Sequence, residues 1–263
     1  MPDMQEPISC EQAIHDIKTP LSIMFNSIRE LENATRETPE LWEPLETIKR
    51  NWLRILKLIT DAGDYQKLRL GLMLPKQANH DIVALVRNIT ESTKALTDRR
   101  NIQLVFESSV KVKQMAVDRD IIDRILLNLL SNAIKFTENG GEIKVRIVED
   151  GDMLGLTVSD TGVGISAEHV RRVFEPHYFV ASPRNTSGTG MGLYIVKQLV
   201  HLLSGDVVLE QSSIGTAITV RIPCFIMDED EQEIRYFDDF YSDNMVHIEL
   251  SDAHISNIAD SVK

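Results

Sequence analysis

The chain has few cysteines and no long apolar run. Its 263 residues include only Cys10 and Cys224, which are far apart and lack metal-ligand spacing. Neither a disulfide framework nor a zinc site is supported, and a reducing compartment fits best. No apolar stretch approaches the roughly 18 to 20 residues that cross a bilayer, and the start lacks a basic region followed by an apolar one. We expect a soluble chain without direct membrane insertion.

Basic residues are also scarce, with 28 Lys and Arg against 40 Asp and Glu and a net charge of -12. Nucleic-acid binding is not expected, because neutralising phosphates needs clustered Lys and Arg. Much of the acidic surplus lies from Ile226 onward. We expect residues 226–263 to be a solvated acidic tail. Alternatively, its aromatic residues could dock on the sandwich expected below or fold on a partner; they are Tyr236, Phe237, Phe240 and Tyr241.

Two segments at the start of the chain carry apolar residues at alternating spacings of 3 and 4, a pattern that keeps one seam facing a partner helix. The first set is Ile14, Ile17, Leu21, Met24, Ile28 and Leu31; the second is Leu41, Leu45, Ile48, Trp52, Ile55, Ile59 and Ala62. The polar stretch 33–39 between them ends in a helix breaker. The pattern predicts an antiparallel hairpin. Because two such helices bury little alone, we expect a homodimeric four-helix bundle.

His15 follows a seam residue, so its ring should lie on the flank of the seam, within reach of solvent. Asp16 is beside it, and Thr19 is one turn away on the same face. Pro20 cannot donate to the carbonyl of Asp16, which should kink the helix and free one acceptor. Alone, this pattern is typical of a surface histidine on an amphipathic helix. Its meaning depends on the residues that follow.

The heptads stop after Leu68, which marks a domain boundary. A helix is predicted to begin near Asn79 or Asp81. Strand-like runs are expected at 102–106, 115–117, 142–149, 153–159 and 217–222. A dinucleotide-binding Rossmann fold is not expected, because Gly188 follows a polar loop instead of a strand.

A helix with Asp118 as its predicted N-cap carries three polar residues on one side, at i, i+4 and i+7. These are Asn128, Asn132 and Lys135. Two amide oxygens on one helix face can hold a hard cation and its waters, and a lysine one turn on can meet phosphate. By spacing alone, an ordinary polar helix face is the favoured reading.

Two glycine-rich loops follow, Asp160-Thr161-Gly162-Val163-Gly164-Ile165 and Ser187-Gly188-Thr189-Gly190-Met191-Gly192-Leu193. A carboxylate at a strand end before a glycine turn can accept a hydrogen bond from an exocyclic amine. Glycines that lead into a helix leave backbone N–H groups and the helix dipole free for phosphate. A single such loop is weak evidence, whereas these elements in this order indicate a nucleotide site.

At this point the sequence resembles a sensor histidine kinase of two-component signalling, and the match covers most of residues 10–223. The segment around His15 resembles the H box, Asn128–Thr137 the N box, and Asp160–Ile165, Gly188–Leu193 and 213–216 the three glycine boxes. The resemblance implies an α+β chain. Its parts would be a dimerisation and histidine phosphotransfer hairpin at 1–68, a catalytic ATP-binding α/β sandwich of the gyrase and heat-shock-90 kind at 69–225, and the tail at 226–263.

The resemblance also implies residue roles. His15 would be the phosphoacceptor, Asp16 would orient or deprotonate its ring, and Thr19 would orient water against a phosphorylated partner. The remaining roles concern ATP and Mg²⁺. Asn132, with help from Asn128, would bind the metal, and Lys135 would contact phosphate. Phe136 would pack near adenine, and Asp160 would accept a hydrogen bond from the adenine amine. The other implied cofactor-binding residues are Gly162, Gly164, Gly188, Gly190, Gly192 and Thr216.

The implied function is ATP-dependent autophosphorylation of His15, transfer to an aspartate of a response-regulator receiver domain, and dephosphorylation of that regulator. One departure is His177, which stands where the family usually has a second Phe. Of Arg171, Arg172 and Arg184, any could approach the γ-phosphate. Only fourteen residues precede His15. We therefore expect either the cytoplasmic portion of a longer, membrane-anchored kinase or a cytoplasmic chain regulated by a partner.

Two other classes compete with this hypothesis. One is a dimeric scaffold whose ATP site only switches conformation. The other is a mechanochemical ATPase or serine kinase that shares the sandwich. Asn128 argues against the ATPases, which usually place a glutamate there to activate water, and the helical hairpin argues against the serine kinases.

Overall fold

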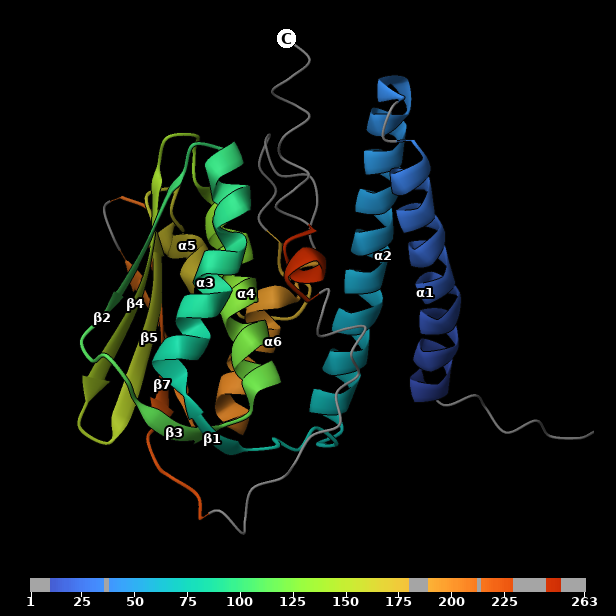
Figure 1. Cartoon of the computed structure of the whole chain (residues 1–263). Coiled ribbons are helices and arrows are strands. Elements are labelled where there is room, and N and C mark those ends of the chain that lie inside the picture. The colour runs from blue at the N-terminus through green and yellow to red at the C-terminus, as the bar shows by residue number, and fades with distance from the viewer. Residues whose placement is uncertain (1–9, 36–37, 180–188, 212–213, 229–244, 252–263) are drawn as a thin grey trace, which may run out of the picture.

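The computed structural model describes residues 10–35, 38–179, 189–211, 214–228 and 245–251. A long helical hairpin stands beside a layered unit of sheet and helices (Figure 1). The hairpin consists of α1 (Cys10–Ala34) and α2 (Trp42–Arg69), with a short 3-10 helix, η1 (Pro39–Leu41), before α2. The predicted hairpin is therefore confirmed, and Pro20 lies inside α1.

Trp52 forms the centre of the hairpin core. It is 1% exposed and stacks on Phe25 with ring centroids 4.7 Å apart. Its Nε1 donates to the Leu21 carbonyl oxygen at 2.8 Å, which satisfies the indole N–H inside an apolar core. The same core also contains Ile28, Leu45, Leu53 and Leu56.

The predicted seam divides into two rows. Buried members are Leu21, Ile28, Leu45 and Trp52, while exposed members are Ile17, Met24, Leu31, Leu41, Ile48 and Ile55. This division follows from heptad geometry, because the two apolar positions of a heptad lie on adjacent sides of the helix. Within one chain, the hairpin therefore covers only half of its seam.

The layered unit contains a five-stranded sheet and a separate antiparallel pair. Its helices and strands are β1 (Ala78–Asp81), α3 (Ile82–Arg99), β2 (Gln103–Ser108), β3 (Gln114–Val117), α4 (Arg119–Phe136), β4 (Glu142–Asp150), β5 (Met153–Asp160), α5 (Ala167–Val170), α6 (Gly192–Leu202), β6 (Asp206–Gln211) and β7 (Thr216–Pro223). The sheet order is β2-β4-β5-β7-β6, and β1 pairs with β3. Among the strands that the structure describes, only β2 and β4 are parallel neighbours. This topology is not a Rossmann fold, as expected.

Helices α3, α4 and α6 cover one face of the sheet (Figure 1). The predicted cap of α4 is present, since Asp118 accepts from the Asp120 N–H at 3.0 Å. Of the two predicted starts for α3, Asn79 and Asp81, the structure has Asp81 as the cap, which accepts from the Val83 N–H at 3.1 Å. These bonds satisfy amides that have no partner within the first helical turn. The strand-like runs all became strands, while β1, β6 and α5 were not predicted.

The acidic tail is not simply solvated, and that expectation is wrong for Met245–Ser251. In this short helical segment Ile248 joins the hairpin core and Leu250 joins the core of the sandwich. Apolar burial explains the docking, because these side chains leave water on both sides of the segment. The four aromatic residues predicted as docking groups lie outside the described residues. Among the described helices, none has the length and apolar character to span a membrane.

Candidate nucleotide site

A cavity of about 390 Å³ lies where α4, the ends of β5 and β7, and the start of α6 meet. Nine of the residues predicted to bind the nucleotide line it: Asn128, Asn132, Lys135, Phe136, Asp160, Gly164, Gly190, Gly192 and Thr216. Gly162 lies just beside it, against the Phe136 carbonyl. Gly188 lies outside the described residues. The structure thus brings residues from four separate sequence boxes to one place.

Asp160 provides a carboxylate at the end of β5. Its Oδ1 accepts from the Gly162 N–H at 2.8 Å. Burial raises the pKa of Asp160, and hydrogen bonds from the backbone N–H groups of Gly162 and Thr216 oppose that rise. The group is therefore a half-buried acceptor in an otherwise apolar part of the cavity, suited to a donor such as an exocyclic amine.

Two glycines allow close backbone approach around this carboxylate. A Cβ at Gly215 would lie 1.7 Å from the Asp160 carbonyl oxygen, and its φ is +74°. A Cβ at Gly162 would lie 2.3 Å from the Phe136 carbonyl oxygen. Because any side chain at either position would displace the backbone, these glycines are required for the shape of the cavity.

Asn128 lies on α4 in a crowded position and is 4% exposed. Its Nδ2 donates to the Arg124 carbonyl oxygen at 3.0 Å and to Glu249 Oε2 at 3.2 Å. A Cβ built on Gly192 would lie 2.7 Å from its Oδ1. The amide oxygen is therefore turned toward the start of α6, where helix N–H groups and phosphate ligands would meet.

The cavity residues fit a nucleotide with a hard cation. Lys135 Nζ lies 5.6 Å from the centroids of both the Phe136 and Phe179 rings, which holds the ammonium over aromatic faces at the cavity wall. Asn132 lines the same wall. In the described part of the chain, no group of three His, Cys, Asp or Glu side chains could hold a metal. Amide oxygens are the donors at hand for a hard cation beside phosphate.

The predicted phosphoacceptor region lies on a different element. His15 falls within α1, and its side chain is outside the described residues. Asp16 and Thr19 are exposed. The neighbouring Ile14 reaches α2, since a Cβ built on Gly63 would lie 3.1 Å from its Cδ1. No described residue of α1 lines the cavity.

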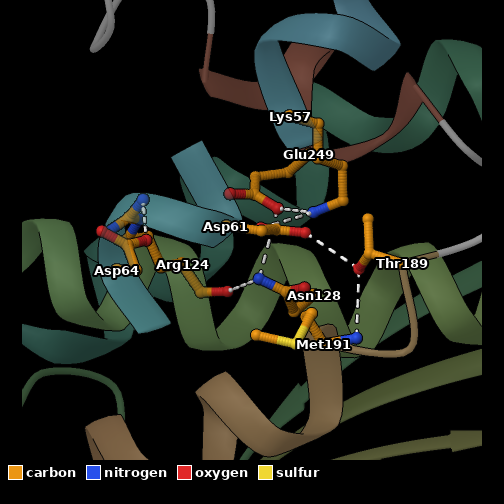
Figure 2. A network of polar contacts seen from close by, with 8 residues as sticks. All are labelled: Lys57, Asp61, Asp64, Arg124, Asn128, Thr189, Met191 and Glu249. Atoms are coloured by element: carbon orange, nitrogen blue, oxygen red, sulfur yellow. Dashed lines mark hydrogen bonds and ion pairs between the residues drawn. The ribbon is translucent and has the colours of Figure 1, made fainter. Parts of the chain in front are cut away.

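Sequence reasoning missed a polar network that joins the hairpin to the cavity (Figure 2). Lys57 of α2 lines the cavity and pairs with Glu249. Asp61 Oδ2 accepts from Thr189 Oγ1 at 3.0 Å, and Asp64 pairs with Arg124. The available signal was the row of charges at 57, 61 and 64, spaced i, i+4 and i+7 on one face of α2.

Burial is the main influence on the pKa values of the two aspartates of this network, Asp61 and Asp64. It raises the pKa of Asp61 to about 6, where Glu249 also raises it while Lys57, Thr189 and Arg124 oppose the rise. Burial likewise raises the pKa of Asp64 against the opposing effect of Arg124. Both carboxylates are charged groups that docking of the hairpin has removed from water.

The segment with His177 in place of the usual Phe contacts the hairpin. His177 has φ +60°, and its ring centroid lies 5.9 Å from that of Tyr65 in α2. Nearby, His169 Nδ1 and Tyr178 Oη are 2.6 Å apart, and Arg172 Cζ lies 4.4 Å from the Tyr178 ring centroid. Arg172 is also paired with Glu175. Arg171 is exposed, and Arg184 lies outside the described residues.

Comparison with known proteins agrees with this geometry. Residues 117–225 match the family described as histidine kinase-, DNA gyrase B-, and HSP90-like ATPase. The sensor histidine kinase RcsC of Escherichia coli (strain K12) is 33% identical over 217 residues, covering 80% of this chain and 22% of RcsC. The autoinducer 2 sensor kinase/phosphatase LuxQ of Vibrio parahaemolyticus is 28% identical over 220 residues, covering 80% and 25%. The chain thus spans about a quarter or less of these relatives.

Solved structures give the same result. Full-length ShkA in complex with AMPPNP superposes with a TM-score of 0.69 at 25% identity, covering 85% of this chain and 47% of that one. The catalytic domain of histidine kinase ThkA gives 0.52 at 25% identity, covering 56% and 95%. Residues 117–225 are therefore a histidine kinase-type ATPase domain, and the chain is similar to sensor histidine kinases over about four fifths of its length.

Proposed function

We propose that this chain is a protein-histidine kinase that uses ATP to phosphorylate His15 and passes the phosphoryl group to an aspartate of a response-regulator receiver domain. The observation that carries the proposal is the assembled nucleotide cavity beside a hairpin with His15 on its first helix. We assign residues 1–68 to dimerisation and phosphotransfer, 69–225 to nucleotide binding, and 226–263 to the tail. The cytoplasmic placement expected from the sequence stays a prediction.

The proposed reaction needs positioning more than covalent assistance from the protein. The neutral ring nitrogen of His15 would donate its lone pair to the γ-phosphorus as the bond to the β,γ-bridging oxygen breaks and ADP leaves. Asp16 would stabilise the positive charge that develops on the ring and accept the ring proton. Both residues lie in α1, so the hairpin has to bring them to the cavity.

The sandwich residues would hold the nucleotide. Asp160 would accept the hydrogen bond from the adenine amine, and the glycines around it would let the base lie against the backbone. Asn132 and Asn128 would bind Mg²⁺, and Lys135 would contact phosphate. The metal would supply neutralisation of the charge on the transferring phosphoryl group.

We further propose that the protein acts as a homodimer and also dephosphorylates its regulator. The exposed seam row supports a dimer, because a second hairpin would cover it. Thr19 supports the second activity, since its hydroxyl lies one turn from His15 on an exposed surface. The printed name of LuxQ also combines kinase and phosphatase.

Incubation with labelled ATP and Mg²⁺ tests the kinase proposal. Label should appear as acid-labile, alkali-stable phosphate and be absent from His15→Gln. Label that persists in this variant would overturn the assignment. A non-catalytic scaffold would instead bind nucleotide without forming phosphohistidine.

The phosphatase proposal has a separate test. Thr19→Ser keeps a hydroxyl and is the matched control for Thr19→Ala. We expect Thr19→Ala to autophosphorylate normally and to dephosphorylate a phosphorylated regulator about a hundredfold more slowly, the lower end of what a positioned acid–base group contributes. Equal dephosphorylation rates in both variants would remove this role.

A further inference from the structure

The segment Met245–Ser251 links the hairpin to the sandwich, and we call it the C-terminal clamp. It lies between α2 and the helical layer (Figure 1). Ile248 is fully buried with Trp52 in the hairpin core, and Leu250, 2% exposed, packs in the sandwich core. Because one short segment fills positions in both cores, its release would expose apolar surface on both parts.

Glu249 lies between these two anchors in the sequence, and its carboxylate points toward Lys57 and Asn128 (Figure 2). Its Oε2 pairs with the ammonium of Lys57 and accepts from Asn128 Nδ2 at 3.2 Å. Lys57 and Asn128 both line the nucleotide cavity. A buried carboxylate is costly unless it is paired and hydrogen-bonded, and these two donors meet that need. An anion is therefore already held at the edge of the cavity.

The same two donors suit a phosphate oxygen. A phosphate oxygen can accept a charge-assisted hydrogen bond from an ammonium group and a neutral one from an amide N–H. Lys57 has a second anionic neighbour, Asp61, at 3.6 Å, which would keep its side chain in place when Glu249 leaves. A terminal phosphate in the cavity would thus meet Lys57 from the hairpin and Asn128 from the sandwich.

We propose that the C-terminal clamp competes with nucleotide binding, because Glu249 occupies the place of the nucleotide's terminal phosphate. When the nucleotide is bound, Lys57 is a further contact for that phosphate. The inference rests on the proposed function in one respect, namely that the cavity binds a nucleoside triphosphate. While Glu249 is engaged, the hairpin is held against the sandwich.

Two further links would open with the clamp. Thr189 connects Asp61 of α2 to the second glycine loop, since its Oγ1 also accepts from the Met191 N–H at 3.0 Å. Asp64 of α2 pairs with Arg124 of α4. These contacts fix α2 of the hairpin against the sandwich beside the cavity. Nucleotide binding and release of the hairpin are therefore coupled through one set of side chains.

Calorimetric titration of the full chain with Mg²⁺ and AMPPNP tests the proposal without requiring phosphotransfer. Glu249→Gln keeps the shape of the side chain and removes its charge. Ile248→Asp removes an anchor that has no contact with the cavity. The matched control is His247→Asp, which adds the same charge at the neighbouring, exposed position.

We expect Glu249→Gln and Ile248→Asp each to lower the Kd for AMPPNP by about tenfold, the change expected if the competent state is only about a tenth populated. His247→Asp should stay within about twofold. Adding Lys57→Met to Glu249→Gln should then weaken AMPPNP binding and leave ADP binding unchanged, because only AMPPNP has the terminal phosphate.

Three results would count against the inference. Equal AMPPNP affinity in wild type, Glu249→Gln and Ile248→Asp would overturn the competition while leaving the proposed function intact. An equal loss of ADP and AMPPNP affinity on adding Lys57→Met would overturn the role of Lys57. Failure of every variant and the wild type to bind either nucleotide would overturn the proposed function itself.

Discussion

The hairpin and the sandwich bury their apolar residues to very different extents. Ile17, Ile48 and Ile55 of the hairpin are 45%, 50% and 44% exposed, whereas Ile122 and Ile125 of α4 are 0% exposed. The sandwich completes its core within one chain. The hairpin does not, because each of its helices has a second apolar row. The sandwich, which would hold the nucleotide, is therefore tightly packed. The hairpin, which carries His15, leaves an apolar surface exposed to solvent.

The largest effect is expected from a substitution in the tightly packed sandwich. Gly215→Ala would place a Cβ against the Asp160 carbonyl oxygen at a positive φ. We expect the free energy of unfolding to fall by about 3 kcal/mol, combining backbone strain with overpacking, and AMPPNP binding to be lost. Urea unfolding and calorimetry measure the two effects.

Gly155→Ala in β5 is the matched control, because its Cβ would meet only ordinary contacts, the nearest at 3.6 Å. It should change stability by less than about 1 kcal/mol. If Gly215→Ala were as stable as this control and still bound AMPPNP, the backbone would not be constrained as described.

The local structure of each part could be predicted from the sequence better than the contacts between the parts. Helix α4 was predicted with its cap at Asp118 and its row of Asn128, Asn132 and Lys135, because capping and periodicity are local signals. The N box and the three glycine boxes then predicted the cavity by resemblance. Strand β6 was missed because it is short, although the Ser204-Gly205 turn signal separates it from α6.

The contacts between the parts could not be predicted. Lys57 and Glu249 are 192 positions apart, and no local pattern relates one charge to the other. The acidic composition of the tail favoured solvation, yet Ile248, Leu250 and Glu249 lie inside the protein. The composition of the tail describes the average polarity of the whole segment. Its docking depends instead on the few side chains that contact apolar and charged partners.

The second prediction addresses the exposed row of the hairpin. In a double variant, Ile48→Glu with Ile55→Glu, two charges would lie in the proposed dimer interface. Losing two buried isoleucines costs roughly 3 kcal/mol or more, so the dimer Kd should rise at least about a hundredfold. Light scattering after size-exclusion chromatography should show the mass of a single chain at concentrations where wild type is dimeric.

Val148→Glu is the control for this change, since Val148 is an exposed residue of β4 in the sandwich. It should leave the mass unchanged. A double variant that remains dimeric would show that the exposed row is not the interface.

The third prediction concerns pH and the junction between the parts. The pKa of Asp61 is raised from 3.8 to about 6 in the folded protein, so the folded state holds its proton more tightly than the unfolded state. Its contribution to stability is therefore full below pH 3.8 and is lost as the pH rises through about 6. The groups that face it are Lys57, Glu249, Thr189 and Arg124.

Asp61→Asn removes this titration and can still accept the Thr189 hydrogen bond. Between pH 4 and pH 7, wild type should lose about 1 to 3 kcal/mol of unfolding free energy relative to Asp61→Asn. Chemical unfolding across this range measures the difference. Parallel pH profiles for the two proteins would contradict the raised pKa of the buried Asp61.

The central claim is that the sandwich holds the nucleotide and the hairpin supplies the acceptor. Parallel AMPPNP titration of His15→Gln and Asp160→Asn tests it most directly. The account predicts wild-type affinity for His15→Gln, and for Asp160→Asn a loss of at least about tenfold, because a buried acceptor for the base is weakened. A His15→Gln variant that binds AMPPNP as weakly as Asp160→Asn would contradict the claim.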